Sequence, residues 1–291
     1  MSARQISGFI ALSLIWGSTW AAIRIVVQDV PPLLSVAIRF ILAFVVMLPV
    51  LLVLRPRLPK GREWGVIAAM SLVMIVLPFG LVALAEQRIS SGTTAILFAT
   101  SPLFTAWMEP HIGSLAQRRR ISRVTHIALW LGLTGVLLVL SRAITLTEPQ
   151  IVGAVLVLGV AIVGAATTTL AKSELEGIPL LTVTTVQFLM ASAVLGLMSL
   201  LLERGHPVTW TRPAVIAMIF LGVISSALGF LLFYWLLGEI RPYQLNARQL
   251  LMPVVAIAEG ALLLHEPLPW TTVAGTTMVL GSLVVAMRKK A

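Results

Sequence analysis

Ten apolar segments divide this chain into two sets of five, separated by short loops rich in proline and charged residues. A helix needs about 20 mainly apolar residues to cross the hydrocarbon core of a bilayer. The predicted spans are residues 6–28, 33–54, 64–85, 90–111, 124–141, 150–171, 180–202, 213–237, 242–264 and 270–287. The pattern therefore predicts an all-α integral membrane protein with ten transmembrane helices.

The composition excludes a soluble globular domain. Of the 291 residues, 58% are hydrophobic and only 11% are charged, too few to cover the surface of a soluble protein of this size. The net charge of +10 comes from basic residues in short loops, which set membrane topology, and indicates no surface for nucleic acid. Cysteine is absent, which excludes disulfides, thiolate catalysis and Cys-bound metals.

The orientation follows from the distribution of Lys and Arg among the loops. Most of the 21 basic residues fall on the side that holds both chain termini, which predicts that both termini are cytoplasmic. The first half of the chain carries most of this bias. The first span follows Arg4 but is too long for the core of a signal peptide, and nine spans come after it, so we expect a retained helix.

Landmarks recur in the same order in the two halves of the chain. Residues 101–104 in the fourth span read Ser-Pro-Leu-Phe, and residues 252–255 in the ninth read Met-Pro-Val-Val. Residues 16–19 in the first span read Trp-Gly-Ser-Thr, and residues 163–166 in the sixth read Val-Gly-Ala-Ala. With five spans per half, alternate threading places the second copy upside down relative to the first. Inverted membrane repeats are typical of alternating-access transporters, which bind substrate near the midplane between the copies.

Several short motifs also occur in a characteristic order. They are Trp-Gly-Ser-Thr-Trp at 16–20, Ala-Ile-Arg-Phe at 37–40, the prolines of spans four and nine, and His-Glu-Pro-Leu at 265–268. In this order they resemble the EamA-type family of the drug/metabolite transporter superfamily, over nearly the whole chain. The resemblance implies two inverted five-helix repeats, here residues 1–142 and 143–291. It also implies a multi-pass protein of the bacterial inner membrane, similar to exporters of aromatic and other amino acids.

One departure from the family pattern concerns the acidic residue expected before the fifth span. Arg119 or Arg120 stands at that position, whereas Glu266 precedes the tenth span. If this carboxylate contributes to gating, the two gates of this protein are not equivalent.

Polar and aromatic residues inside the spans are the candidates for a substrate site. Polar groups in hydrocarbon must find partners or water, so their helical faces point toward a cavity or a packed interface. Helix packing is the alternative for the small hydroxyl residues, because Ser and Thr also allow close helix contacts. The predicted cavity residues are Trp16, Thr19, Trp20, Arg39, Phe79, Thr94, Ser101, Thr167, Gln187, Tyr234, Tyr243, Asn246, Arg248 and Gln249.

Charged residues within spans are the most informative of these candidates. Arg248 is too costly to place against lipid, so it binds a substrate carboxylate or pairs with a helix C-terminus or a glutamate. Arg39 has the alternative of lying near the membrane surface and snorkelling, as long basic side chains do close to helix ends.

A second group of residues is predicted to act in gating or in coupling transport to a proton. Prolines in matched spans interrupt helices at a binding site, and buried carboxylates carry protons. For the glutamates the alternative is an ordinary water-accessible position at the edge of a loop. These candidates are Glu86, Pro102, Glu109, Pro253, Glu259 and Glu266.

The leading hypothesis is a transporter that exports small metabolites, with amino acids foremost, through a central cavity between the repeats. The fifth and tenth spans lack intramembrane charge and are expected to be supporting helices. A facilitator or proton-coupled exporter of drugs, nucleobases or sugar derivatives is a neighbouring alternative. We expect a small-molecule substrate, a bilayer environment, activity as a monomer, and neither a cofactor nor a metal.

A membrane-embedded lipid enzyme is the rival from another class. Such chemistry needs paired carboxylates, a His-carboxylate relay or clustered metal ligands. The chain has a single Asp, Asp29, and its four His residues are dispersed. The adjacent pair His265-Glu266 lies in a short loop, so we do not expect an enzyme. A channel is disfavoured because there is no selectivity-filter pattern.

Replacing Asn246 or Gln249 by Ala is expected to weaken transport without unfolding the protein, because both amides lie on one predicted face of the ninth span. Efflux from reconstituted vesicles measures the effect. Unchanged efflux kinetics in both variants would refute the assignment of this face to the substrate site.

Overall fold

The computed structural model is a bundle of helices and describes residues 2–101, 103–104, 123–140, 147–175, 177–239 and 248–288. Within these ranges there is no β-strand. The helices in chain order are α1 (Ala3–Gly17), α2 (Thr19–Asp29), α3 (Pro32–Leu54), α4 (Arg62–Ser71), η1 (Leu72–Val76), α5 (Leu77–Glu86), α6 (Ser91–Phe98), α8 (Arg123–Leu140), α9 (Glu148–Glu174), α10 (Leu180–Leu202), α11 (Arg212–Ile219), η4 (Phe220–Leu228), α12 (Gly229–Glu239), α14 (Arg248–Leu263) and α15 (Trp270–Arg288).

In the described part of the chain, six helical segments, some of which join two or three of these helices, are long and apolar enough to cross a membrane. They are Ala3–Asp29, Pro32–Leu54, Arg62–Glu86, Glu148–Thr167, Leu180–Leu202 and Arg212–Phe233. Shorter apolar helices cover Trp130–Val139 and Leu251–Leu263. The all-helical, membrane-type fold is thus confirmed, and the count of ten spans stays a prediction.

The helix starts follow from local chemistry in the loops. Ser2 and Gln5 form a capping box at the start of α1, in which each side chain accepts a hydrogen bond from the backbone of the other. Thr211 caps α11 by accepting from the backbone N–H of Ala214. Pro32 opens α3, where its missing N–H leaves no helical hydrogen bond unmade.

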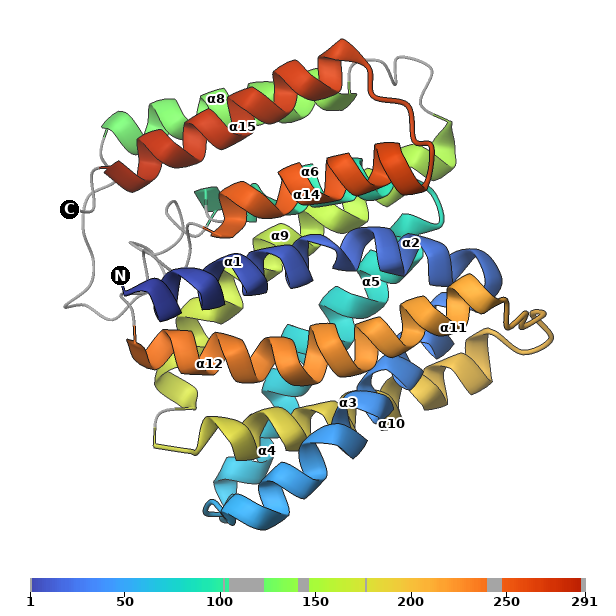
Figure 1. Ribbon diagram of the computed structural model, residues 1–291, viewed down its shortest axis with the longest axis vertical. Helices are drawn as coiled ribbons and strands as arrows, with labels where there is room; N and C mark the ends of the chain where they lie inside the picture. Colours follow the sequence, from blue (N-terminus) through green and yellow to red (C-terminus); the bar gives the residue numbers. More distant parts are fainter. Residues whose placement is uncertain are drawn as a thin grey trace.

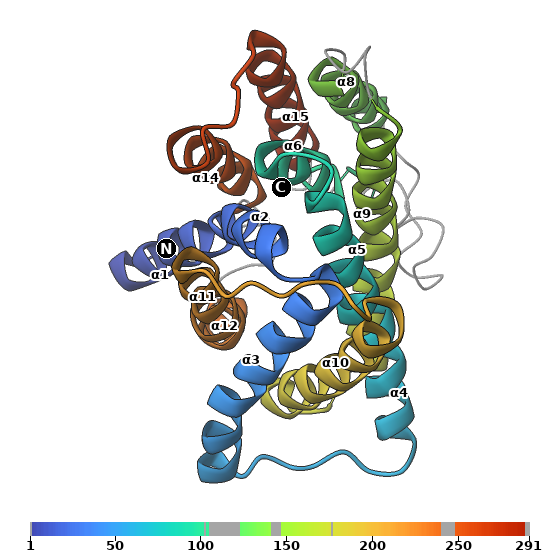
Figure 2. The ribbon, with the colours of Figure 1, turned by 90° about the vertical axis from the view of Figure 1, so that its right-hand side faces the viewer.

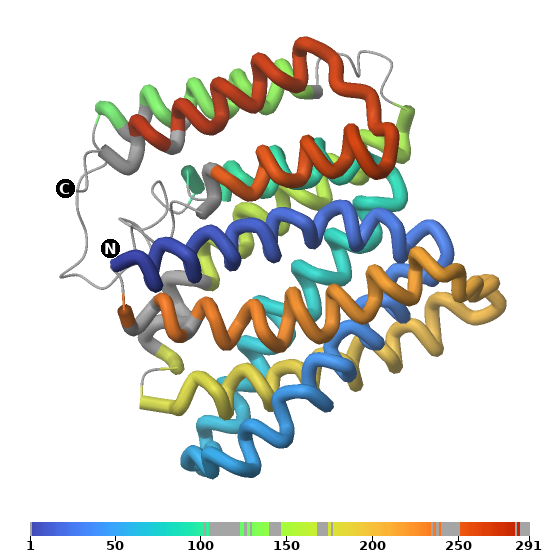
Figure 3. The backbone as a smooth tube through the Cα atoms, in the orientation of Figure 1, coloured from blue at the N-terminus to red at the C-terminus, as the bar shows by residue number. Residues whose placement is uncertain are grey.

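The helices run back and forth in one bundle, so the start of α1 and the end of α15 lie at the same side (Figure 3). The helices α8 and α15 form a pair at one extreme of the molecule, and α3 packs against α10 at the other (Figures 1 and 2). Between these pairs, α1 packs against α12 and α14, and α5 packs against α9. Helices from the first and second halves of the chain are therefore interleaved throughout.

Two segments of π-helix interrupt long helices, and neither was predicted. The segment η1 lies within the third predicted span, and η4 lies within the eighth, so they occupy corresponding spans of the two halves. After η1, Leu77 donates a backbone hydrogen bond to Leu72, five residues earlier, and Pro78 has no N–H to donate to Met74. Short π-helical segments inside α-helices occur frequently at functional sites.

The interior of the bundle is apolar, and so is much of its outer surface. Phe40, Phe188 and Leu195 are completely buried in one central cluster. In contrast, Val53 is 79% exposed and Leu262 is 75% exposed. Large apolar side chains on the outside are expected where lipid is the solvent.

The pair α8 and α15 depends on the absence of side chains at two facing glycines. A Cβ on Gly275 would lie 2.5 Å from the carbonyl oxygen of Gly135, and a Cβ on Gly135 would lie 2.7 Å from the carbonyl oxygen of Gly275. Gly281, on the same helix as Gly275, instead faces open space. Small residues that bring backbones together are a principal source of helix association in membranes.

Replacing Gly275 by Ala is therefore expected to force α8 and α15 apart and to lower the free energy of unfolding by about 1–3 kcal/mol. Gly281→Ala is the matched control on the same helix and should be neutral or slightly stabilising, because Ala favours the helix. Thermal unfolding of the purified protein in detergent compares the two. Equal midpoints for both variants would contradict the packing role of Gly275.

Candidate functional site

A cavity of about 320 Å³ lies in the centre of the bundle, which is within the usual range for small-molecule sites. Its walls come from the middle of the long helices and from both halves of the chain. The lining residues are Trp16, Thr19, Trp20, Ile23, Arg39, Met74, Pro78, Phe79, Val82, Phe98, Ser101, Val160, Gly164, Thr167, Phe230 and Met252. Among the described residues, no lining residue comes from α8 or α15, and the supporting role of these helices stays a prediction.

Many of the predicted cavity residues meet at this cavity. The set that the structure brings together is Trp16, Thr19, Trp20, Arg39, Phe79, Ser101 and Thr167. They come from helices far apart in the sequence, so their shared position is a product of the fold. Their role in binding stays a prediction.

The Trp-Gly-Ser-Thr-Trp motif sits where α1 ends and α2 begins, with Ser18 between the two helices. A Cβ on Gly17 would lie 2.6 Å from the Cβ of Val255, so this glycine allows α1 to touch α14. Ser18 donates a hydrogen bond to the carboxylate of Glu259 at 2.6 Å. Thr19 donates to the carbonyl oxygen of Trp16 one turn earlier. The motif thus joins α1 to α14 and leaves its two tryptophans on the cavity.

The two tryptophans of the motif differ in their hydrogen bonding. The indole N–H of Trp16 donates to the carbonyl oxygen of Ser225 at 3.1 Å. The indole nitrogen of Trp20 is buried and has no hydrogen-bond partner among the described residues. A buried donor without a partner is costly in a protein interior. Trp20 therefore lines the cavity with its ring, while its indole N–H is buried and unpaired among the described residues.

Arg39 is the only charged residue among the lining residues that the structure describes, and its side chain is buried. Its Nε donates to the hydroxyl of Ser226 at 2.9 Å, and its Nη2 donates to the hydroxyl of Ser225 at 3.2 Å. The guanidinium lies 4.8 Å from the ring centre of Phe79 and 5.6 Å from that of Phe40. Cation–π contacts and two hydroxyls hold this charge in place, and no carboxylate among the described residues pairs with it.

The alternative that Arg39 snorkels toward the membrane surface is wrong. Arg39 is only 4% exposed, and its guanidinium is covered by η4 and by two phenylalanines. The sequence position near the start of the second span favoured snorkelling, but the packing of η4 against α3 closes that route.

Aromatic rings form a continuous wall beside Arg39. Phe40 contacts Phe79 edge to face, with ring centres 5.0 Å apart, and stacks on Phe188 at 5.3 Å. Phe230 contacts both Phe188 at 5.4 Å and Trp16 at 5.6 Å. Such contacts fix the rings in defined orientations, which shapes the cavity as well as burying area.

Other predicted cavity residues lie elsewhere. Thr94 and Gln187 are buried but do not line the cavity, and Thr94 donates to the carbonyl oxygen of Ser90 in its own helix. Tyr234 is in α12, and Arg248 and Gln249 are in α14, but the structure does not describe the side chains of these three residues. Tyr243 and Asn246 fall outside the described residues, as do Pro102 and Glu109 among the gating candidates. Pro253 is buried in α14, next to the cavity residue Met252.

The expectation that Glu86 is an ordinary water-accessible carboxylate is wrong. This side chain at the end of α5 is completely buried, and neither carboxylate oxygen has a hydrogen-bond partner among the described residues. Arg24 reaches the backbone carbonyl oxygen of Glu86 instead of its carboxylate. The helical position alone did not show that neighbouring helices cover this end of the span.

Glu266 has a defined contact with the first half of the chain. Its Oε1 accepts from the backbone N–H of Ser91 at 2.9 Å, and its Oε2 accepts from the Ser91 hydroxyl at 3.0 Å and the Gly92 N–H at 3.4 Å. The carboxylate thus caps the N-terminus of α6, where the helix dipole also favours negative charge. The loop before α15 is tied to α6 by this contact.

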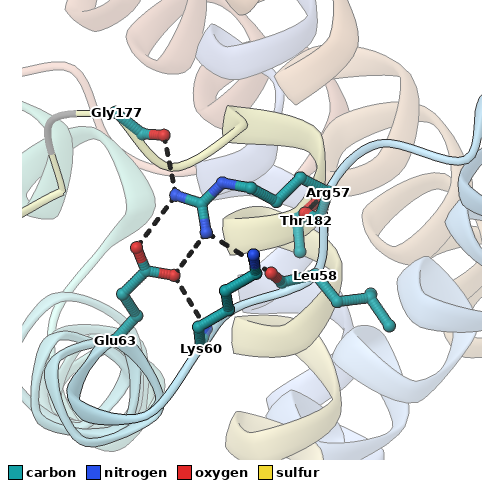
Figure 4. A network of polar contacts seen from close by, with 6 residues as sticks. All are labelled: Arg57, Leu58, Lys60, Glu63, Gly177 and Thr182. Atoms are coloured by element: carbon teal, nitrogen blue, oxygen red, sulfur yellow. Dashed lines mark hydrogen bonds and ion pairs between the residues drawn. The ribbon is translucent and has the colours of Figure 1, made fainter.

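Polar contacts join the two halves of the chain at both ends of the bundle. At the end that holds Glu266, the carboxylate of Glu203 accepts from the backbone N–H groups of Leu33 and Leu34 at 2.8 and 3.0 Å. At the opposite end, Arg57 pairs with Glu63 at 2.7 Å and donates to the carbonyl oxygen of Gly177 (Figure 4). These contacts tie segments of the two halves together at the two ends of the bundle.

Several lining residues were absent from the sequence-based candidates. Four of them are the apolar residues Met74, Val82, Val160 and Met252. From sequence alone, an apolar residue in a span is interpreted as a packing or lipid contact. Ser225, which holds both Arg39 and Trp16, has a signal in the sequence, because it forms a Ser-Ser doublet in an otherwise apolar segment.

Comparison with known proteins identifies the family. The EamA-like transporter family matches the chain twice, over residues 4–141 and over residues 151–288. The uncharacterized transporter YoaV of Bacillus subtilis is 26% identical over 274 residues, which cover 94% of this chain and 92% of that protein. The uncharacterized inner membrane transporter YedA of Escherichia coli is 27% identical, over 86% of this chain and 79% of that protein.

One relative is named for its substrate, and one solved structure shows the fold. A probable amino-acid metabolite efflux pump of Salmonella typhimurium is 24% identical over 290 residues, which cover 96% of this chain and 93% of that protein. A solved structure, titled only as the crystal structure of a protein, has a TM-score of 0.67 at 16% identity and covers 98% of both chains.

Replacing Glu266 by Gln is expected to lower the free energy of unfolding by about 1–3 kcal/mol, because an amide cannot accept from all three donors of Ser91 and Gly92. Glu174→Gln, at an exposed end of α9, is the matched control and should have no effect. Thermal unfolding in detergent compares the two. A Glu266 variant as stable as the wild type would show that the cap contributes nothing.

Proposed function

Because this chain belongs to the EamA-like transporter family, we propose that it exports small metabolites, with amino acids foremost, across the bacterial inner membrane. The central cavity carries this proposal. It is lined from both halves of the chain, lies in the middle of the long helices and has the volume of a small-molecule site. Transport needs no chemical step, so the protein acts as a carrier and not as an enzyme.

Alternating access between two inverted five-helix repeats, residues 1–142 and 143–291, is the mechanism we propose. The two separate family matches support it. So do two corresponding contacts between the halves: Gly17 of α1 lies against Val255 of α14, and Gly164 of α9 lies closest to Ser101, which follows α6. In each case the glycine of the first helix of a half meets the proline-containing segment of the other half.

The polar contacts at the two ends of the bundle are the proposed gates. Opening the cavity to one side requires the contacts on that side to break while those on the other side hold. The carboxylates of Glu203 and Glu266 form one gate by capping α3 and α6. The pair of Arg57 and Glu63, with Gly177, forms the other. Because the two gates use different contacts, they need not open with equal ease.

The proposed topology has ten spans with both termini in the cytoplasm. The excess of Lys and Arg at the end that holds the start of α1 supports this orientation. Each protein encloses a cavity from a single chain, which supports function as a monomer. The relative named as an inner membrane transporter supports the location.

The amino-acid assignment has two supports. The Salmonella relative is named as an amino-acid metabolite efflux pump. In the cavity, Arg39 offers a positive charge for a carboxylate, while Trp16, Phe79 and Phe230 offer apolar surface for a side chain.

Proton-coupled export has one specific observation in its favour. Glu86 is a buried carboxylate without a hydrogen-bond partner among the described residues, and such a group is most easily accommodated when it carries a proton. It also lies on the face of α5 that carries Phe79 and Val82 to the cavity. A proton gradient that drives efflux in wild-type vesicles but not in Glu86→Gln vesicles would support this candidate.

Replacing Gly164 by Leu tests the cavity directly. The new side chain fits, since the nearest atom to a Cβ there is 3.8 Å away, but it fills space that the substrate needs. We expect proteoliposome efflux of the transported amino acids to fall at least about tenfold, which corresponds to roughly 1.4 kcal/mol. Gly159→Leu is the control, because it meets open space on the same helix and does not line the cavity.

Efflux is measured against a panel of amino acids, nucleobases and cationic drugs. Equal loss in both glycine variants would contradict the position of the substrate site. Transport of the cationic drugs alone would overturn the amino-acid assignment.

A further inference from the structure

The described lining of the cavity carries a positive charge and no negative charge. Arg39 forms no ion pair within the described part of the chain, and the described residues that line the cavity include no Asp or Glu. A buried charge is strongly unfavourable unless an opposite charge or several hydrogen bonds compensate it. Two serine hydroxyls and two aromatic rings compensate Arg39 only in part. The site as a whole is therefore complementary to an anion.

The hydrogen-bonding groups of the cavity lead to the same conclusion. The described hydrogen bonds of Arg39 use Nε and Nη2, which leaves Nη1 for a ligand. The indole N–H of Trp20, another lining residue, also has no partner among the described residues, but its nitrogen is itself buried and is not open to the cavity. The guanidinium donates and cannot accept. A ligand that satisfies Nη1 must bring an acceptor oxygen.

The guanidinium is held in a fixed orientation before any ligand arrives. Ser225 and Ser226 come from the π-helical segment η4, and Ser225 also accepts the indole N–H of Trp16 through its carbonyl oxygen. The ring of Phe79 lies against the guanidinium at 4.8 Å. Pre-organised donors bind an anion more strongly than flexible ones, because less side-chain entropy is lost.

Apart from the hydroxyl residues Thr19, Ser101 and Thr167, the rest of the described wall is mainly apolar. Phe98, Phe230, Met74 and Met252 face the same space, together with the two tryptophans. Tryptophan, phenylalanine and methionine side chains suit flat or irregular apolar groups. In contrast, the described lining offers no acidic group for an ammonium.

We propose that this cavity selects compounds with a carboxylate on an apolar or aromatic body, that Arg39 binds the carboxylate, and that an α-ammonium group is not required. The proposal rests on the transport function proposed above and narrows its substrate class. Amino acids and the corresponding acids without the amino group both fit. Amines that lack the carboxylate do not.

A matched series of four probes tests this selectivity: 3-phenylpropanoate, its neutral analogue 3-phenylpropanamide, phenylalanine and phenethylamine. They share one aromatic body and differ in the charged groups that they carry. Binding to the full-length protein in detergent is measured by isothermal titration calorimetry and by quenching of tryptophan fluorescence, since Trp16 and Trp20 line the cavity. Binding avoids the passive leak of such compounds through vesicles.

The wild type is expected to bind 3-phenylpropanoate at least as tightly as phenylalanine. It should bind this acid at least about tenfold more tightly than the amide or phenethylamine. In Arg39→Gln the preference for the acid over the amide should disappear, and Arg39→Lys should keep part of it. Arg204→Gln, at an exposed arginine just after α10, is the control and should keep the whole preference. The ratio of the two dissociation constants does not depend on the fraction of folded protein, so a purely structural role of Arg39 would leave it unchanged.

Two results would overturn the inference. One is an acid-to-amide ratio that Arg39→Gln does not change, and the other is binding of phenethylamine as tight as that of the acid. If none of the four probes binds while other compounds cross reconstituted membranes, the substrate class is wrong and the transport function stands. If no compound of the wider panel crosses, the proposed function itself fails.

Discussion

The structure depends on one constraint, which is that hydrocarbon offers no hydrogen bonds to a polypeptide. Backbone groups are therefore satisfied within helices, and polar side chains gather where helices face one another. Arg39 is the clearest example, since its guanidinium lies between two serine hydroxyls and two phenylalanine rings at the centre of the bundle. At the cavity, a guanidinium N–H of Arg39 without a described partner lies beside empty space.

Close helix contacts and local irregularities shape that space. Gly17 and Gly275 let backbones approach where a side chain would clash, which fixes α1 against α14 and α8 against α15. The π-helical segments η1 and η4 shift the register of the helices that carry Met74 and Ser225 to the site. The closely packed pair of α8 and α15, together with cavity helices that π-helical segments interrupt, is consistent with a carrier whose two ends are closed by separate polar contacts.

Sequence reasoning found the polar and aromatic part of the site better than its apolar part. Trp16, Trp20 and Arg39 stand out because such groups are expensive or unusual inside a span, and all three line the cavity. Met252 was missed because nothing in the sequence distinguishes an apolar cavity wall from ordinary packing. Glu86 was misjudged because exposure depends on neighbouring helices and not on distance from the end of a span.

The sequence by itself determined the class of protein, since a run of long apolar segments with basic loops has no stable arrangement outside a bilayer. It also determined the family, through short motifs in a characteristic order. Only the tertiary structure decided which polar residues share one cavity, that Arg39 is buried with no carboxylate partner in the described part of the chain, and that Glu266 caps α6. The physical reason is that helical periodicity specifies the face of each helix, whereas the partner of that face depends on how helices distant in sequence pack together.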